Sequence, residues 1–200
     1  MFSSWILFTL MAAFMQSWRN AFQKQLSATV DVYGVTLARF LFGFPFAVLY
    51  IFWLYQSHPI QLHASFTAMF WVYILIAGCS QILATILMVM LFKQKNYAVG
   101  VGLAKSEAIL AALIGVMLLQ EHLSLLGWAG VVIGGAAVFL LSKGHQQQKL
   151  SLSTLMIGVG SGLSFAITSL LVREASLELS ALPFLHRAAW VLLCVIGFQC

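Results

Sequence analysis

The chain alternates long apolar segments with short polar breaks. A membrane-spanning α-helix needs about 20 mostly apolar residues, and seven segments of roughly that length can be distinguished. Because the breaks between them hold only a few residues, consecutive helices are expected to lie antiparallel and side by side. The pattern therefore predicts an all-α membrane protein, an antiparallel bundle of about seven transmembrane helices. The predicted helices cover residues 4–24, 34–55, 68–92, 97–119, 125–142, 152–173 and 183–200.

Composition supports the same class of protein. Hydrophobic residues make up 62% of the chain and charged residues only 8%. Soluble domains carry roughly 25% charged residues because their surfaces face water. This composition excludes a soluble globular protein and predicts an integral, multi-pass protein whose main partner is the lipid bilayer. In a membrane protein the net charge of +5 reflects basic residues that set the orientation in the membrane and contact anionic headgroups. No nucleic-acid partner is therefore expected.

Lysine is distributed unevenly among the polar breaks. The breaks at 57–67 and 120–124 contain neither Lys nor Arg, whereas the alternate breaks are basic. By the positive-inside rule the basic side is cytoplasmic, which places the N-terminus outside. Arg173 and Arg187 oppose this assignment, since they flank a break on the other side. The basic side holds Lys24, Lys93, Lys95, Lys143 and Lys149.

Two pairs of bases recur at nearly the same separation. Arg39 and Arg187 each stand near the start of an apolar helix, 148 residues apart. Lys24 and Arg173 each stand at the end of an apolar helix, 149 residues apart. The separation spans five helices, and an odd number turns the second copy upside down in the membrane. Inverted repeats are typical of secondary transporters, which bind substrate near the midplane where the two halves meet.

Lys105 and Glu107 interrupt the apolar run at 97–119, close to the centre of that predicted helix. A charge at this depth costs at least about 2.5–3.5 kcal/mol, so it is expected to face the bundle interior or a wet cavity. Two residues correspond to about 200° around a helix, so each side chain is expected to have its own partner. The favoured interpretation is a substrate- or proton-binding pair, with Glu107 as a protonatable counter-ion. The alternatives are a structural ion pair with Arg39 or Arg19, or a neutral buried carboxyl group.

Four further side chains are candidates for lining a solute path. Arg39 lies about one turn inside the second predicted helix, where it either faces a cavity or extends to the membrane interface. Gln16 and Gln81 lie at mid-membrane positions and either line the path or form interhelical hydrogen bonds. Trp18 belongs either to the cavity or to an interfacial aromatic belt.

Glycines define two surfaces suited to close packing. Gly130 and Gly134 form a small-xxx-small surface, which lets another backbone approach either within the fold or in a homodimer. The run GVGSG at 158–162 lacks the strand, charge and spacing of a phosphate-binding loop. Close helix packing is therefore the better interpretation of that run.

Residues for catalysis or metal binding do not assemble in the sequence. Asp31 is the only aspartate, which excludes paired-aspartate chemistry on a metal-bound phosphate. The five histidines fall in or beside polar breaks, without an HExxH arrangement. We therefore expect no enzyme, no metal site and no cofactor. The cysteines are interpreted as small apolar side chains within helices: Cys79, Cys194 and Cys200.

The segment 98–142, AVGVGLAKSEAILAALIGVMLLQEHLSLLGWAGVVIGGAAVFLLS, contains a small-residue helix, a Gln120-Glu121 turn and a glycine-rich helix. It resembles the fourth and fifth helices of an EamA-type domain of the drug/metabolite transporter superfamily. LARFLFGFPFA, beginning at Leu37, resembles the second helix of that domain, where an arginine commonly begins the apolar run. The chain departs from the family pattern at Ala108, where a proline is often found.

Members of this family usually have ten helices in two inverted halves. The resemblance therefore implies a first EamA-like five-helix repeat at 1–142, a basic linker loop at 143–151, and the start of a second repeat at 152–200 that is expected to be truncated. The family is usually described with the N-terminus in the cytoplasm, against the lysine distribution, so the orientation stays open.

The resemblance also implies a function. It predicts a secondary transporter, or a fragment of one, that moves a small metabolite or drug-like solute by alternating access. The expected location is the bacterial inner (plasma) membrane. The alternative is a non-transporting membrane scaffold or a degraded transporter remnant.

Overall fold

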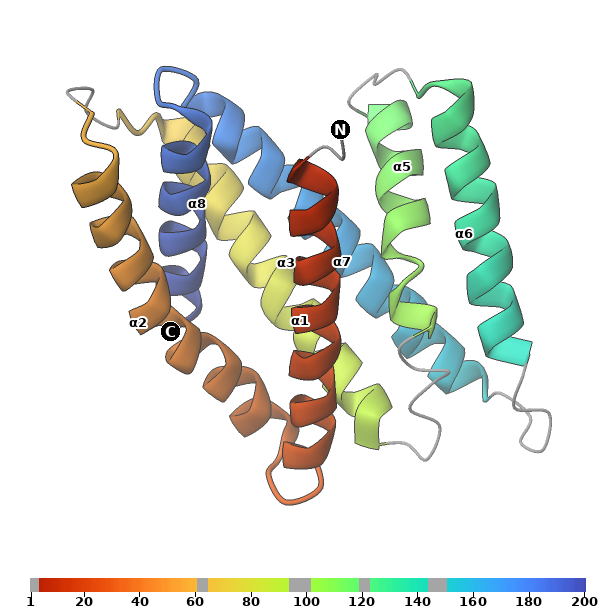
Figure 1. Ribbon diagram of the computed structural model, residues 1–200. Helices are drawn as coiled ribbons and strands as arrows, with labels where there is room; N and C mark the ends of the chain where they lie inside the picture. Colours follow the sequence, from red (N-terminus) through yellow and green to blue (C-terminus); the bar gives the residue numbers. More distant parts are fainter. Residues whose placement is uncertain (1–3, 61–64, 94–101, 119–122, 144–150) are drawn as a thin grey trace.

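The computed structural model describes residues 4–60, 65–93, 102–118, 123–143 and 151–200, and every regular element in these ranges is an α-helix (Figure 1). Helix boundaries follow the hydropathy pattern to within a few residues for most elements. The largest extension is at the end of the sixth predicted helix, which continues past Arg173. The helices are α1 (Ser4–Leu26), α2 (Val32–Ser57), α3 (Ala68–Lys93), α5 (Glu107–Leu118), α6 (Leu125–Lys143), α7 (Leu152–Glu178) and α8 (Phe184–Gln199).

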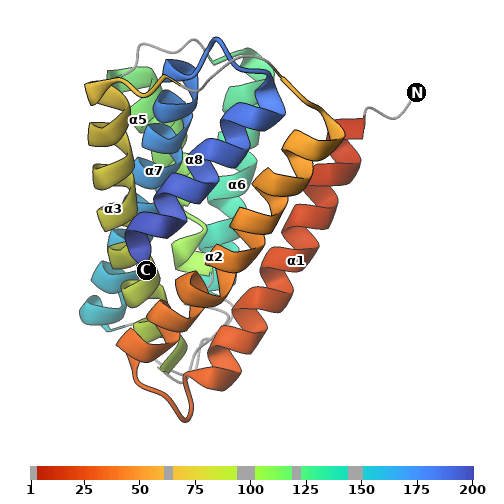
Figure 2. The same ribbon diagram turned by 90° about the vertical axis from the view of Figure 1, so that its left-hand side faces the viewer.

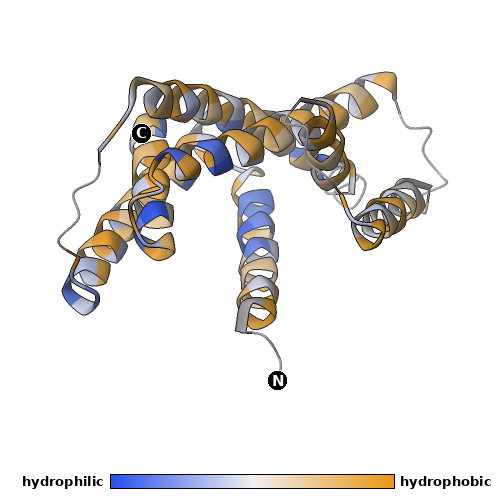
Figure 3. Cartoon of the chain, turned by 90° about the horizontal axis from the view of Figure 1, so that it is seen from above, coloured by the Kyte–Doolittle hydropathy of each residue, from blue (hydrophilic) through white to orange (hydrophobic). Residues whose placement is uncertain are grey.

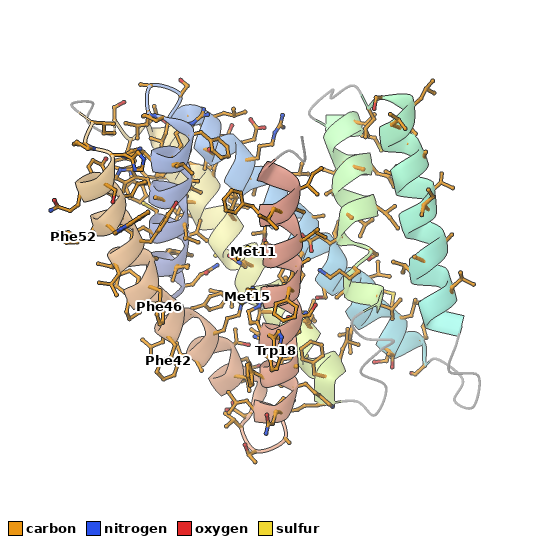
Figure 4. The ribbon with its side chains drawn as sticks, in the orientation of Figure 1. Met11, Met15, Trp18, Phe42, Phe46 and Phe52 are labelled. Carbon is orange, nitrogen blue, oxygen red and sulfur yellow. The ribbon has the colours of Figure 1, made fainter. Side chains whose placement is uncertain are left out.

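The outer surface of the bundle is apolar. Among the described helices α2, α3 and α7 are long and apolar enough to cross a membrane, and α1 is similar in length but carries Arg19 and Lys24. Phe42 and Phe46 of α2 are each 72% exposed, on the face shown in Figure 4. A continuous apolar surface of this kind is stable against lipid and would aggregate in water. The fold is therefore that of an integral membrane protein.

α3 and α7 cross at the centre of the molecule and make its most extensive helix contact. Small side chains bring the two backbones close, and Ala84 and Ala166 are fully buried. The Ser161 hydroxyl donates a hydrogen bond to the Ala84 carbonyl (2.9 Å), and the Thr168 hydroxyl to the Ala77 carbonyl (3.4 Å). Lipid provides no hydrophobic drive for helix association, so close packing and such interhelical hydrogen bonds hold this pair together.

α8 packs mainly against α2 and α3 and less against α7, its neighbour in the sequence. The Gln199 amide donates to the Gly78 carbonyl (3.3 Å) and to Gln81 Oε1 (2.7 Å), which ties α8 to α3. α7 and α8 contact each other, as expected of consecutive helices, but each packs more closely against other helices. Short breaks fix the antiparallel direction, whereas side-chain fit selects the partner.

α6 lies at the right-hand edge of the bundle in Figure 1, and α1 lies at the right-hand edge in Figure 2 and projects from the other helices in Figure 3. α6 contacts mainly α5, and α1 contacts mainly α3, where the Lys24 ammonium donates to the backbone oxygen of Phe92. Gly130 and Gly134 of α6 face open space within the described part of the chain. These glycines therefore do not serve packing between the described helices, and a homodimer through them stays a prediction.

The fourth predicted helix is interrupted. A helical turn at 102–104 is followed by a non-helical turn at Lys105 and Ser106, and α5 begins only at Glu107. The prediction of one continuous helix over 97–119 is therefore wrong; its ends, 97–101 and 119, lie outside the described residues. At 12 residues α5 is about 18 Å long, well short of the roughly 30 Å hydrocarbon core.

Backbone hydrogen bonds show how the helix is interrupted at this point. The N–H groups of Lys105 and Ser106 reach back three residues, to the carbonyls of Gly102 and Leu103 at 3.1 Å each, instead of four. The Ser106 carbonyl then accepts the first bond of α5, from the Leu110 N–H at 2.9 Å. Ser106 thus directly precedes α5, but its hydroxyl has no hydrogen-bond partner among the described residues and does not cap the helix. Glu107 follows it in the first turn of α5, where the helix dipole favours an acidic side chain.

Two glycines of α7 make room for the break. A Cβ added at Gly162 would meet the Ser106 hydroxyl and lie 3.2 Å from the Glu107 nitrogen. A Cβ added at Gly158 would lie 2.6 Å from the Leu103 Cβ. The prediction that the glycine run at 158–162 serves close helix packing is confirmed. Its partner is the interrupted turn, which sits directly on α7.

Candidate functional site

A small, partly open pocket with a cavity volume of about 10 Å³ lies where α1, α3, α5 and α7 meet the break before α5. α1 contributes polar side chains at 3.6-residue spacing, because one face of this helix is turned toward the bundle. α3 and α7 contribute larger apolar side chains from their crossing. The pocket is lined by Gln16, Arg19, Asn20, Met88, Ala104, Lys105, Glu107 and Phe165.

Lys105 and Glu107 both line this pocket, although they were expected to face different directions around a helix. The backbone between them is not helical, so the helical angle between successive residues does not apply. Glu107 is half-buried, and its Oε1 accepts a hydrogen bond from the Ser169 hydroxyl of α7 at 2.8 Å. The break therefore brings an exposed base, Lys105, and a half-buried acid, Glu107, to the same pocket.

Arg19 is the second base of the pocket. It interacts electrostatically with Glu107, but within the described part of the chain the two do not form a direct ion pair. Its buried Nε has no hydrogen-bond partner among the described residues. Asn20, one position further along α1, is only 6% exposed, and its Oδ1 likewise has no partner there. The pocket thus presents a donor and an acceptor that are available to a bound molecule.

Arg39 lies next to the pocket without lining it. Its guanidinium donates to the Thr85 hydroxyl at 2.9 Å. It also lies over the Phe40 ring (5.4 Å to the centroid) and the Phe165 ring (5.9 Å). Because Phe165 belongs to the pocket wall, Arg39 adds positive potential from behind that wall.

The other predicted site residues fall into two groups. Gln16 lines the pocket. Gln81 is bonded to Gln199 in the contact between α3 and α8, away from the pocket lining. Trp18 is 51% exposed on the outer face of α1 (Figure 4), with its ring next to Phe14 and Phe22 at 6.2 and 5.7 Å between centroids. The roles predicted for these residues stay predictions.

Sequence reasoning missed several lining residues. Met88 and Phe165 belong to uniformly apolar helices, and no local signal separates their pocket side from their lipid side. Asn20 carried a usable signal, because it lies one helical turn beyond Gln16 on the same face. The Ser106-Glu107 pair carried another, since serine followed by an acidic residue is typical of a helix start.

The chemistry of the pocket is that of binding. Two bases, one acid, amide groups, a thioether and an aromatic ring are gathered in a small space. Among the described residues there is no group of three or more metal-ligating side chains. Such a mixed lining suits a small solute that carries charge at one end and apolar surface at the other.

The EamA-like transporter family model matches residues 3–143 of this chain, well over half of its length. Comparisons with curated proteins and with solved structures give no match. The matched region contains α1, α2, α3, α5 and α6, and hence every pocket-lining residue except Phe165. This family consists of membrane transporters and not of enzymes, in agreement with the apolar outer surface of the helices. The chain belongs to the EamA-like transporter family.

Proposed function

We propose that the protein is a secondary transporter that moves a small, charged metabolite or drug-like solute by alternating access, with the pocket around Glu107 as its binding site. The membrane in question is a bacterial inner (plasma) membrane. The observation that carries the proposal is the position of the pocket at an interrupted membrane helix, lined by Lys105 and Glu107.

The interrupted helix supports a binding role. Charged groups inside a membrane are expensive and occur mainly where they serve a substrate or ion pathway. Transporters commonly build their sites from broken helices, whose freed backbone groups and terminal dipoles face the solute. Here the start of α5 carries Glu107 into the pocket, beside the turn that carries Lys105.

The direction of the helices supports an inverted arrangement. α1 and α7 run in opposite directions along the bundle, and so do α2 and α8 (Figure 1). Arg39 lies near the start of α2 and Arg187 near the start of α8, so these two bases lie toward opposite ends of the bundle. This is the placement that an inverted repeat offset by 148 residues would produce.

Both halves of the bundle hold a buried apolar cluster, and among the described residues the larger one lies where α3 begins, the smaller one at Met88, Phe92 and Ala104. Where α3 begins and α7 ends, Phe70, Ile74 and Leu179 belong to a buried apolar cluster. Side-chain bonds tie the same end together: Thr67 donates to Glu178 (2.7 Å) and Trp190 to Tyr55 (3.0 Å). At the opposite end the Lys24 ammonium bonds to the Phe92 carbonyl.

Glu107 is the coupling group in this proposal. Its carboxyl accepts a bond from Ser169 and lies in the field of Arg19, so both a proton and a cationic part of a solute compete for it. Binding one at the expense of the other would link solute movement to proton movement. Lys105 and Arg19 would hold the anionic part of the solute.

Flux into proteoliposomes tests the proposal, with a panel of labelled amino acids, nucleosides and cationic dyes. We expect the wild-type chain to move at least one class, and Glu107→Gln and Lys105→Ala to lose at least about tenfold in rate. Lys93→Ala is the control and should keep the wild-type flux, because Lys93 is exposed at the end of α3, away from the pocket lining. Wild-type rates in both pocket variants would remove the pocket from the mechanism. Absence of flux for every class in the wild-type chain would favour the scaffold alternative.

A further inference from the structure

α1 has two chemically different faces. The outer face carries large apolar side chains that are more than half exposed, among them Met11, Met15, Trp18 and Phe22 (Figure 4). The inner face carries polar side chains at intervals of three or four residues, which places them in one row along the helix. The row consists of Gln16, Arg19, Asn20, Gln23 and Ser27.

The middle of this row is buried and yet lacks hydrogen-bond partners. Asn20 and Gln23 are each only 6% exposed. Asn20 Oδ1 and both side-chain polar atoms of Gln23 have no partner among the described residues. Buried polar groups are almost always hydrogen-bonded, to protein or to ordered water. Three unpaired atoms on adjacent turns of one helix therefore indicate that this face is hydrated.

The row leads from the pocket to one end of the bundle. Gln16, Arg19 and Asn20 line the pocket, and Gln23 lies one turn closer to the end of α1. That end is basic, because Lys24, Lys93 and Lys143 lie at the last turns of α1, α3 and α6, which end on the same side (Figure 1). The apolar cluster around Phe70 lies at the opposite end of the bundle, and a second one, at Met88, Phe92 and Ala104, lies beside the pocket.

We propose that the inner face of α1, at Asn20 and Gln23, forms a hydrated path along which small polar solutes and water pass between the pocket and the basic end of the bundle. The proposal rests on the proposed transport function for its solute. The path itself depends only on the geometry of α1. Helix α1 is suited to this role because it lies at the edge of the bundle and contacts mainly α3.

Cysteine labelling tests whether the path is hydrated. In the full chain, Cys79, Cys194 and Cys200 are first replaced by serine, and a single cysteine is then introduced as Gln23→Cys or Phe22→Cys. These neighbours lie at nearly the same depth but about 100° apart around α1, with Phe22 59% exposed on the apolar side and Gln23 only 6% exposed. A charged, membrane-impermeant thiosulfonate reagent should modify Gln23→Cys at least about tenfold faster, and faster from the basic side. Equal rates at both positions would overturn the proposal.

A second measurement tests whether the path is used. Gln23→Leu keeps a similar side-chain volume and removes both polar atoms, and should lower flux at least about fivefold in protein that remains monodisperse. Gln23→Asn keeps an amide and should retain most of the flux. Wild-type flux in Gln23→Leu would show that solute does not pass this face. The labelling experiment does not depend on transport, so failure of the transport hypothesis and failure of the path give different results.

Discussion

At the scale of single residues, Glu107 determines the electrostatics of the pocket. It is the only acidic residue among the described lining residues, and it shares the space with Arg19 and Lys105. Arg39 adds a further positive charge from behind Phe165. In the proposed function, this excess of positive charge would favour a ligand with an anionic group, and Glu107 with its partner Ser169 would face a cationic group.

The hydroxyl of Ser169 is expected to hold Glu107 in its binding orientation. Ser169→Ala removes this hydrogen bond to an acidic group, which is worth about 1.5–3 kcal/mol, and should lower flux by roughly tenfold or more. Ser169→Thr keeps a hydroxyl and should retain most of the activity. Ser17→Ala is the control, because the Ser17 hydroxyl bonds only locally, to the Ala13 carbonyl. Equal flux in the two alanine variants would contradict the positioning role.

Two neighbouring residues of α1 should respond differently to truncation. Asn20 lines the pocket, whereas Trp18 is exposed on the outer face. Asn20→Ala should reduce flux at least about fivefold, because it removes a polar wall of the binding site. Trp18→Ala should keep flux within about twofold of the wild-type rate. A larger loss in Trp18→Ala would assign this residue to the solute path after all.

At the scale of secondary structure, the interruption before α5 is the element that creates the site. A continuous helix would place Lys105 and Glu107 about 200° apart, on different faces. The turn at Lys105 and Ser106 removes this constraint, and both side chains reach one pocket. The break is accommodated by α7, whose Gly158 and Gly162 leave space for it.

Gly162→Ala is expected to disturb this break specifically. The added methyl group would meet the Ser106 hydroxyl and crowd the Glu107 backbone, so we expect a loss of about 1–3 kcal/mol in unfolding free energy. Gly160→Ala is the matched control, because its Cβ would lie 3.5 Å from Leu87 Cδ1, an ordinary contact. That variant should be neutral or more stable by up to about 1 kcal/mol, since alanine favours helix. Thermal unfolding in detergent compares the two, and an equal response would argue against a tight contact at the break.

At the scale of the whole molecule, two side-chain bonds between distant segments tie the end of the bundle where α3 begins, and the bond from Lys24 to the Phe92 carbonyl lies at the other end. Thr67 and Trp190 bond to partners on other helices at the first end. Gln23 lies toward the second end with both amide atoms unpaired within the described residues. A transporter that alternates would have to release the first end during its cycle.

Fixing the tied end should therefore stop transport. Thr67→Cys combined with Glu178→Cys places two thiols where a hydrogen bond now joins α7 to the residue just before α3. Joining them with a short bifunctional thiol reagent, in a background without the native cysteines, should reduce flux to background. Each single variant treated with the same reagent should keep its flux. Unchanged flux in the cross-linked double variant would show that this end does not open.

The sequence predicted most of the helices and part of the site. Helix positions follow from the hydropathy of about 20 consecutive residues. They can therefore be read without knowing which other segments the helix contacts. Lys105 and Glu107 were identifiable because charge within an apolar run is rare. Phe165 and Ser169 could not be identified in this way, because apolar and hydroxyl side chains are common in α7. Nothing in the sequence shows which of them contacts the pocket or Glu107.

The sequence by itself determined the class of this protein, the position of most of its helices and the presence of charge within an apolar run, because each depends on residues close together along the chain. The tertiary structure decided which helices pack together, where the fourth helix breaks and which side chains meet in the pocket. These depend on the fit between segments far apart, such as Ser169 and Glu107, which lie 62 residues apart. Hydropathy places a helix in the membrane, but only packing against other helices sets which of its faces meets the solute.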